Sequence, residues 1–322
     1  MDKRSGNLKT NFTEIARELN ISRGTIYRVV NQSPLVAPET RSRVIEALNR
    51  HGYYTHRRIR RSRICFDFCE FRYLKEMGEL LMKRLPESEY TCFRTDHRKN
   101  RETFFNTSAA CDVAVFCSIP EDSLLEEVHK INPELFTVTL TTESCADVTI
   151  TPNNKLGGEL AARHLASLGQ KDIAVFLSDL HPTRMERYKS FIGEMHVLSP
   201  DSRITPIYHH DGINFTYTFE DYFRTCGKMP DTIFFPAGYF AQIFWDEFAS
   251  KGAPYDQIGI MSYDHPEDNF HLFDRIEFQR QHILDWAEYY ITNRPMMKKR
   301  SPVHTSVGVT LVTAGSIKKK EG

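Results

Sequence analysis

Polar side chains suited to reading nucleic-acid bases share one face of a short predicted helix. In the stretch NISRGTIYRVVNQ, residues 20–32, apolar side chains recur at helical spacing, which leaves a polar face made of Arg23, Thr25, Arg28 and Asn31. The guanidinium group of arginine bridges two acceptors on the edge of guanine, whereas Ser, Thr and Asn side chains usually contact phosphates. The same pattern also fits an amphipathic helix whose arginines are merely solvated.

Two further helices would have to position this stretch. The segment FTEIARELN, residues 12–20, has one apolar stripe, with Thr13 as a candidate N-cap. After a tight turn, Ser22 is placed to cap the helix that carries the polar face. A third helix is expected from Pro38 to Gly52, a residue type suited to a left-handed C-terminal cap. Three short helices of this kind form a minimal core.

The formal net charge of zero hides an asymmetry along the chain. Residues 1–63 contain 14 Lys and Arg against 5 Asp and Glu, whereas the remainder contains 28 against 37. A basic segment attached to an acidic body is typical of a polyanion-binding head. A solvated basic tail would have the same composition, so the order of the residues has to distinguish the two.

The order of residues in the head resembles that of a known family. The stretch FTEIARELNISRGTIYRVVNQSPLVAPETRSRVIEALNRHGY is similar over nearly its whole length to the DNA-binding head of the LacI family of bacterial transcriptional regulators. The matching elements are I-A in the first helix, I-S-x-x-T-I-x-R-V-x-N in the second, V-x-P-x-T-R-x-x-V opening the third, and the closing G-Y. The resemblance implies a helix-turn-helix whose second helix enters the major groove.

The resemblance also implies roles for individual residues. It places Arg23 and Gly24 at the main base-reading positions and Arg28 at a third. The positions implied to contact the DNA backbone are Ser22, Thr25, Asn31 and Tyr53. Because Gly24 stands where the family usually has a polar side chain, we expect an operator code carried mainly by two arginines.

The segment after the head departs from the family pattern. Where the family has a short helix with alanines and a leucine that wedges into the minor groove, this chain has THRRIRRSR, residues 55–63. Ile59 is the only wedge candidate in that segment. The arginines expected to follow the phosphates or a narrow minor groove are Arg57, Arg58, Arg60 and Arg61. We therefore expect a short basic hinge that reaches the first strand of the core several residues early.

Beyond the hinge, apolar runs alternate with helix-like segments. Runs such as ICFDF, DVAVFCS, IAVFLS and VGVTLV are typical of buried parallel strands, and segments such as KLGGELAARHLASLG separate them. The alternation predicts an α/β core of mostly parallel sheets, and the resemblance implies a two-lobed, periplasmic-binding-protein-like arrangement. The expected domains are a head at 1–54, a hinge at 55–63 and a core at 64–322, with lobe 1 at about 64–152 and 278–300 and lobe 2 at about 153–277 and 301–322.

Two lobes leave a cleft between them. Open α/β sheets bind ligands outside the carboxyl ends of their strands, so we expect a ligand site in that cleft. The segment NNKLGGELAARHLASLGQKDIAVF is similar to the family's segment at the start of the second lobe. Carried over by position, the resemblance implies an effector site lined by Phe71, Asn153, Arg187, Tyr239 and Asp264. Arg and Asp suit vicinal hydroxyls or an anion, and aromatic rings suit a sugar or base face. Asn153 replaces the family's aspartate, and TAGS near the end of the chain lacks the family's arginine.

Other classes of chemistry find little support in the sequence. The seven cysteines lack the C-x-x-C spacing of a zinc site, so we expect neither a metal nor a cofactor. Motifs of serine hydrolases, P-loop NTPases and zinc proteases do not occur. No apolar run approaches the roughly 20 residues of a membrane helix, and residues 1–10 are polar. We expect a cytoplasmic protein that is not an enzyme and has no membrane partner.

These observations predict a DNA-binding transcriptional regulator, acting as a repressor. It is expected to bind a pseudo-palindromic double-stranded operator as a homodimer, with its affinity changed by a small-molecule effector such as a carbohydrate. One alternative is a DNA-binding regulator whose core no longer responds to a small ligand. A second is a soluble carbohydrate-binding protein with an incidental head, which would bind DNA weakly and without sequence preference.

Overall fold

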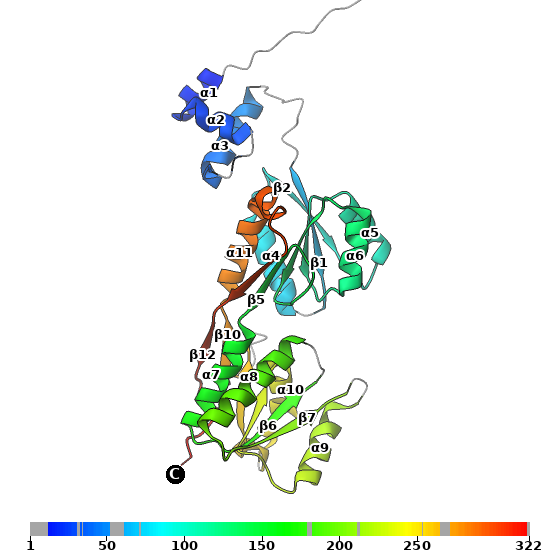
Figure 1. Ribbon diagram of the computed structural model, residues 1–322, viewed down its shortest axis with the longest axis vertical. Helices are drawn as coiled ribbons and strands as arrows, with labels where there is room; N and C mark the ends of the chain where they lie inside the picture. The colour runs from blue at the N-terminus through cyan, green and yellow to red at the C-terminus, as the bar shows by residue number, and fades with distance from the viewer. Residues whose placement is uncertain are drawn as a thin grey trace, which may run out of the picture.

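The molecule consists of three bodies, a small helical head and two α/β lobes (Figure 1). The computed structural model describes residues 12–30, 33, 35–51, 61–70, 72–178, 182–210, 213–252, 254–264 and 271–320. The first lobe lies between the head and the second lobe, and the described residues end at the far side of the second lobe (Figure 1).

The head consists of helices α1 (Phe12–Leu19), α2 (Arg23–Val30) and α3 (Pro38–Arg50). Its core is formed by the apolar stripes of the three helices, and Ile15, Ile26 and Val44 are fully buried in it. Because α1 already begins at Phe12, Thr13 lies in its first turn and is not its N-cap, contrary to the sequence-based expectation. The expected stop at Gly52 lies outside the described residues, and α3 ends two residues earlier with His51 as its C-cap.

The first lobe is built on a six-stranded parallel sheet in the order β11-β5-β4-β3-β1-β2. Its strands are β1 (Ser62–Phe68), β2 (Tyr90–Thr95), β3 (Val113–Cys117), β4 (Phe136–Leu140), β5 (Val148–Pro152) and β11 (Val303–Val307). Its helices are α4 (Arg72–Arg84), α5 (Arg101–Ala109), α6 (Asp122–Ile131), α11 (Arg280–Thr292) and α12 (Arg294–Met297). Helices α4 and α11 pack together on one face, and α5 and α6 cover the other (Figure 1). Burial on both faces explains the unbroken apolar run of β3 and the mostly apolar residues of β1.

The second lobe has a six-stranded sheet in the order β12-β10-β9-β8-β6-β7, in which only the β10–β12 pair is antiparallel. Its strands are β6 (Asp172–Leu177), β7 (Arg203–Tyr208), β8 (Thr232–Phe235), β9 (Gly259–Tyr263), β10 (Asp274–Phe278) and β12 (Val309–Val312). Its helices are α7 (Asn154–Ser167), α8 (Pro182–Leu198), α9 (Phe215–Cys226) and α10 (Gly238–Glu247), with 3₁₀ turns η1 (Ala249–Lys251) and η2 (Tyr255–Gln257). The predicted α/β class with mostly parallel sheets is confirmed.

The chain crosses between the lobes three times, at β5–α7, β10–α11 and β11–β12. The third crossing corrects the expected boundary, which assigned residues 301–322 to the second lobe. Residues 303–307 pair with β5 in the first sheet, so the chain changes lobes at Gly308. The run VGVTLV, expected to be one strand, is accordingly divided between β11 and β12. Strand β11, with the sequence VHTSV, was hard to detect from the sequence. It lies at the sheet edge, and its side chains alternate between half-buried and exposed up to the buried Val307.

The carboxylate of Asp274 in β10 forms hydrogen bonds with the segment that follows β12. It accepts hydrogen bonds from the backbone N–H groups of Ala314 (2.6 Å) and Gly315 (2.7 Å) and contacts His164 Nε2 at 2.8 Å. Burial by itself would raise the pKa of Asp274, but the bonds from His164 and the two backbone groups lower it below its usual value.

The acid sensitivity of the second lobe follows from this lowered pKa. The contribution of Asp274 to stability is present above the unfolded-state pKa of about 3.9 and is lost as the pH falls through the lower folded-state pKa. We expect Asp274→Asn to lower the free energy of unfolding at pH 7 by about 1–3 kcal/mol, and by less at pH 3. Urea unfolding at both pH values measures this difference. The exposed Asp256→Asn is the control, and equal losses for Asp274→Asn at both pH values would contradict the assignment.

Candidate nucleic-acid interface and inter-lobe site

Helix α2 is held by a tight turn and a side-chain cap. Asn20 has a φ of 54°, a left-handed conformation that asparagine tolerates better than most residues, and it turns the chain sharply after α1. Ser22 Oγ accepts a hydrogen bond from the backbone N–H of Thr25 (3.1 Å) and lies 2.9 Å from Thr25 Oγ1. Ser22 therefore caps α2 as expected, and the first turn of the helix has a defined direction.

The outward face of α2 presents two available cations. Arg23 and Arg28 are exposed, whereas Ile26 and Val29 on the other face are buried in the head. Among the residues that the structure describes, no carboxylate lies within ion-pair distance of either guanidinium group. Gly24 is exposed between them, and an added Cβ would meet only Ser22 Oγ at 3.5 Å. The face is thus free to approach a ligand closely.

The other residues predicted to contact DNA divide into two groups. Ser22 is exposed and Thr25 half-buried, and their mutual contact leaves oxygen lone pairs for a further partner. Arg61 is exposed immediately before β1. The remaining predicted contacts lie outside the described residues and stay predictions, namely Asn31, Tyr53, Arg57, Arg58, Ile59 and Arg60.

One ion pair joins the head to the first lobe. Arg41 Nε of α3 lies 3.9 Å from Glu89 Oε2, just before β2, and the two side chains are only 11% and 16% exposed. Burial raises the pKa of the Glu89 carboxyl, and the charge of Arg41 opposes that rise. The contact places α3 against the lobe and leaves the arginines of α2 exposed.

Three of the predicted effector-binding residues have hydrogen-bond partners within the chain, namely Asn153, Asp264 and Arg187. Asn153 caps α7 by accepting a bond from the N–H of Leu156 (2.9 Å). Asp264, at a φ of 67°, accepts bonds from Arg280 Nη2 at 3.2 Å to each carboxylate oxygen. Phe71 lies outside the described residues, and Tyr239 is 59% exposed.

Among the predicted effector-binding residues that the structure describes, Arg187 is the most buried. Its Nε donates to Asn154 Oδ1 (2.9 Å), its Nη1 donates to the carbonyl of Pro236 (2.6 Å), and its guanidinium carbon lies 3.6 Å from the ring centre of Tyr263. Burial lowers the pKa of Arg187 and raises the pKa of Tyr263 to about 12, which the charge of Arg187 opposes. Arg187 therefore links α7, α8 and the ends of two strands.

A tyrosine of the first lobe reaches the same region. The ring of Tyr73 on α4 packs edge-on against Phe278 of β10, with 6.5 Å between ring centres. Burial raises the pKa of the Tyr73 hydroxyl. Arg187 and Asp264 are close enough to influence this pKa as well. The structure thus places Arg187 and Asp264 in the same region as a side chain from the other lobe.

The sequence-based prediction missed a buried polar cluster at the carboxyl ends of β1 and β3. Asp67 is fully buried, and its Oδ2 accepts from Ser118 Oγ (2.6 Å) and lies 2.7 Å from His97 Nδ1. The signal was an acidic residue near the end of ICFDF and a serine at the end of DVAVFCS, the strand ends at which α/β sheets bind ligands.

The second lobe has an open depression of about 640 Å³ between the first turns of α7 and the N-terminal half of α8. It is lined by Lys155, Pro182, Met185, Glu186, Lys189 and Ser190, and by none of the predicted effector-binding residues. The described residues gather no group of three His, Cys, Asp or Glu side chains able to hold a metal ion. No helix among them is both long and apolar enough to cross a membrane.

Comparisons with known proteins agree with the head and the fold. Residues 11–56 match the model for bacterial regulatory proteins of the lacI family. No curated protein sequence matches the chain. The chain therefore carries the DNA-binding domain of lacI-family regulators, and the family resemblance predicted from the sequence is confirmed.

Solved structures of such regulators share the fold of nearly the whole chain. The lac repressor bound to ONPG is 15% identical with a TM-score of 0.61, covering 94% of this chain and 98% of its own. The regulator CelR in complex with cellobiose is 14% identical with a TM-score of 0.63, covering 95% and 99%. Cra from Pseudomonas putida with fructose 1-phosphate is 14% identical with a TM-score of 0.64, covering 78% and 98%. The chain thus joins a segment that matches the lacI family to a two-lobed α/β core that shares the fold of these regulators.

Proposed function

We propose that the protein is a sequence-specific transcriptional regulator that acts as a repressor. The observation that carries the proposal is the capped helix α2, whose Arg23 and Arg28 are exposed and have no carboxylate partner among the described residues. This arrangement suits a helix that enters the major groove and reads guanine with its arginines. The match of residues 11–56 to the lacI family supports the same role.

The regulator is proposed to act as a homodimer on a pseudo-palindromic operator. A head with one short reading helix makes few base contacts, and linking two heads raises the effective concentration of the second at its half-site. A lac repressor dimer bound to operator, 15% identical to this chain, has the same fold. We infer a cytoplasmic location, where the DNA is accessible, and no enzymatic activity, because the sequence has no recognised catalytic motif.

Selection of bound sequences from a random duplex library tests the DNA-binding proposal. The purified full chain is expected to enrich two inverted half-sites at a fixed spacing, each containing guanines for Arg23 and Arg28. Half-sites without inverted symmetry would contradict the dimer. Enrichment of no sequence at all would contradict the regulator and favour a carbohydrate-binding protein with an incidental head.

The region between the lobes is proposed to bind a small-molecule effector, such as a sugar or a related metabolite. Similar folds bind cellobiose in CelR and fructose 1-phosphate in Cra. A ligand that favours one arrangement of the lobes would change the relative placement of the heads, and thereby operator affinity, with reciprocal coupling. The polar groups supporting this site are Asp67, His97, Arg187 and Asp264.

A second candidate is a regulator whose core does not respond to a small ligand. This candidate is favoured because the side chains predicted to bind an effector already form interactions within the protein. Asn153 caps α7, Arg187 is hydrogen-bonded and stacked, and Asp264 is paired with Arg280. Thermal unfolding in the presence of sugars, sugar phosphates and nucleobases separates the two candidates. An effector must raise the melting temperature and also change operator affinity. If no compound in the panel changes the melting temperature, the second candidate is supported.

A further inference from the structure

We propose that the first lobe contributes a second DNA-contacting surface, which binds phosphates of the duplex held by the head. This surface, named the basic rim, consists of residues 294–300, RPMMKKR, which form α12 and the segment after it. The proposal rests on the proposed DNA-binding function and extends it from the head to the core.

The topology of the first sheet places the basic rim on the side of the lobe where the head is attached. The strands are parallel, so they all begin at the same edge of the sheet, and β1 begins there directly after the hinge. The preceding helix α11 ends near β2, where the Tyr90 hydroxyl lies 3.5 Å from Thr292 Oγ1. Lys298 Nζ then donates to the carbonyl of Pro133 (2.8 Å), shortly before β4, and the chain continues into β11. The basic rim therefore runs along the edge at which the strands begin.

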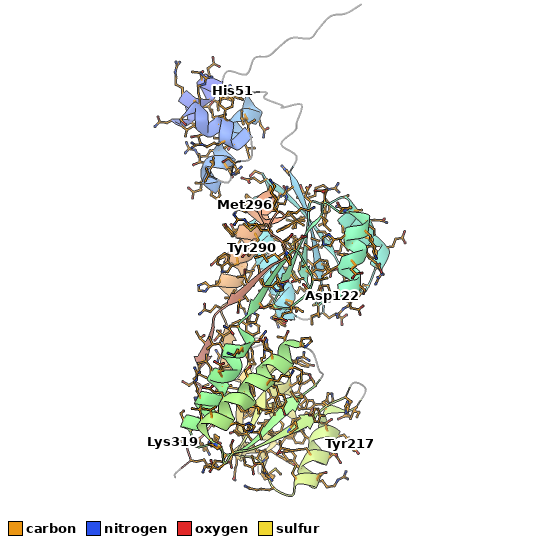
Figure 2. The ribbon with its side chains drawn as sticks, in the orientation of Figure 1. His51, Asp122, Tyr217, Tyr290, Met296 and Lys319 are labelled. Carbon is orange, nitrogen blue, oxygen red and sulfur yellow. The ribbon has the colours of Figure 1, made fainter. Side chains whose placement is uncertain are left out.

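The head lies next to this edge. Arg41 of α3 contacts Glu89, the residue before Tyr90, so the same strand end touches both the head and α11. Met296 lies at the end of the first lobe that faces the head, whereas Lys319 lies at the far end of the second lobe (Figure 2). Residues 51–61 connect α3 to β1, and even fully extended they span at most about 40 Å. A duplex held by α2 therefore remains near the basic rim.

Carboxylates of the described residues pair with only part of the positive charge of the basic rim. Lys298 is paired with Glu134 at 3.2 Å. Lys299 and Arg300 are exposed, and within the described parts of the chain neither has a carboxylate at ion-pair distance. Arg294, half-buried, likewise has no carboxylate partner there. Cations of this kind beside a bound duplex would contact phosphates, release counterions and strengthen binding to any sequence.

The salt dependence of DNA binding tests the proposal quantitatively. The variant Lys299→Gln/Arg300→Gln is compared with wild type and with Lys318→Gln/Lys319→Gln. The second variant removes two exposed cations, of which Lys319 lies at the far end of the second lobe (Figure 2). Each phosphate contact contributes about 0.9 to the slope of log affinity against log salt concentration. We expect the rim variant to lose about 1.8 of that slope and to bind operator and random duplexes several-fold more weakly. The control variant should retain the wild-type slope.

Photo-crosslinking locates the contact independently. A benzoylphenylalanine residue at position 299 is expected to crosslink to the bound duplex, and the same residue at position 319 is not. A wild-type slope in the rim variant, or equal crosslinking from both positions, would overturn the proposal while leaving the DNA-binding function intact. Absence of DNA binding by the wild-type protein would overturn the proposed function and the basic rim together.

Discussion

Replacing Arg23 by alanine is expected to lower discrimination at one operator base pair by about 1–3 kcal/mol, which is roughly 5- to 150-fold in relative affinity. The reason is geometric: Arg23 begins α2, Ser22 fixes the direction of that helix, and the guanidinium group is exposed. A bidentate contact to guanine is lost for the preferred base only. Affinities for the operator and for its single-base variants, measured at one salt concentration, provide the test.

A matched control separates base reading from general electrostatics. Arg17 is also exposed in the head but lies on α1, whereas Arg23 and Arg28 lie on α2. Arg17→Ala should change the affinities for all sequences by the same factor, or leave them unchanged. If Arg23→Ala behaved in the same way as Arg17→Ala, its role as a base-reading residue would be excluded.

The largest effect on stability is expected from Arg187→Ala. The substitution leaves the acceptors of Asn154 and Pro236 without their donor and opens a cavity beside Tyr263. Each unsatisfied buried acceptor costs about 1–3 kcal/mol, and with the cavity we expect a loss of about 3–5 kcal/mol in the free energy of unfolding. Arg187→Lys, which keeps the charge but cannot reproduce the planar geometry of the guanidinium group, should lie between alanine and wild type.

The two tryptophans allow the affected lobe to be identified. Trp245 lies on α10 of the second lobe and Trp286 on α11 of the first. In a Trp286→Phe background, the fluorescence of Trp245 reports urea unfolding of the second lobe. The control is Arg163→Ala, which removes exposed ion pairs with Glu159 and Glu194 and should change little. A loss below about 1 kcal/mol for Arg187→Ala would contradict its structural role.

The sequence predicted the head well because its determinants are local. The spacing of Ile26 and Val29 defines the buried face of α2, Ser22 defines its start, and the exposed face then follows. The apolar runs of β1, β3 and β6 identified the layered core for the same reason. Local patterns did not reveal β11, because an edge strand with polar residues lacks a continuous apolar run.

The inter-lobe site was less predictable because its partners come from distant parts of the chain. Arg187 bonds to Asn154 and to Pro236, and Asp264 pairs with Arg280. The family resemblance identifies polar residues by position, but it does not reveal which groups of the protein form hydrogen bonds with them. The same limit applied to the Asp67–Ser118 bond, which joins the ends of two separate strands. The roles of these residues toward a ligand stay predictions.

The central claim, that α2 presents Arg23 to a guanine in the major groove, is tested most directly by removing one acceptor from the DNA. Each operator guanine is replaced in turn by 7-deazaguanine, which lacks N7, and affinity is measured for wild type and Arg23→Ala. We expect one guanine per half-site at which the replacement weakens wild-type binding but not Arg23→Ala binding, because only wild type uses that acceptor. Equal weakening of both proteins at every guanine would contradict it.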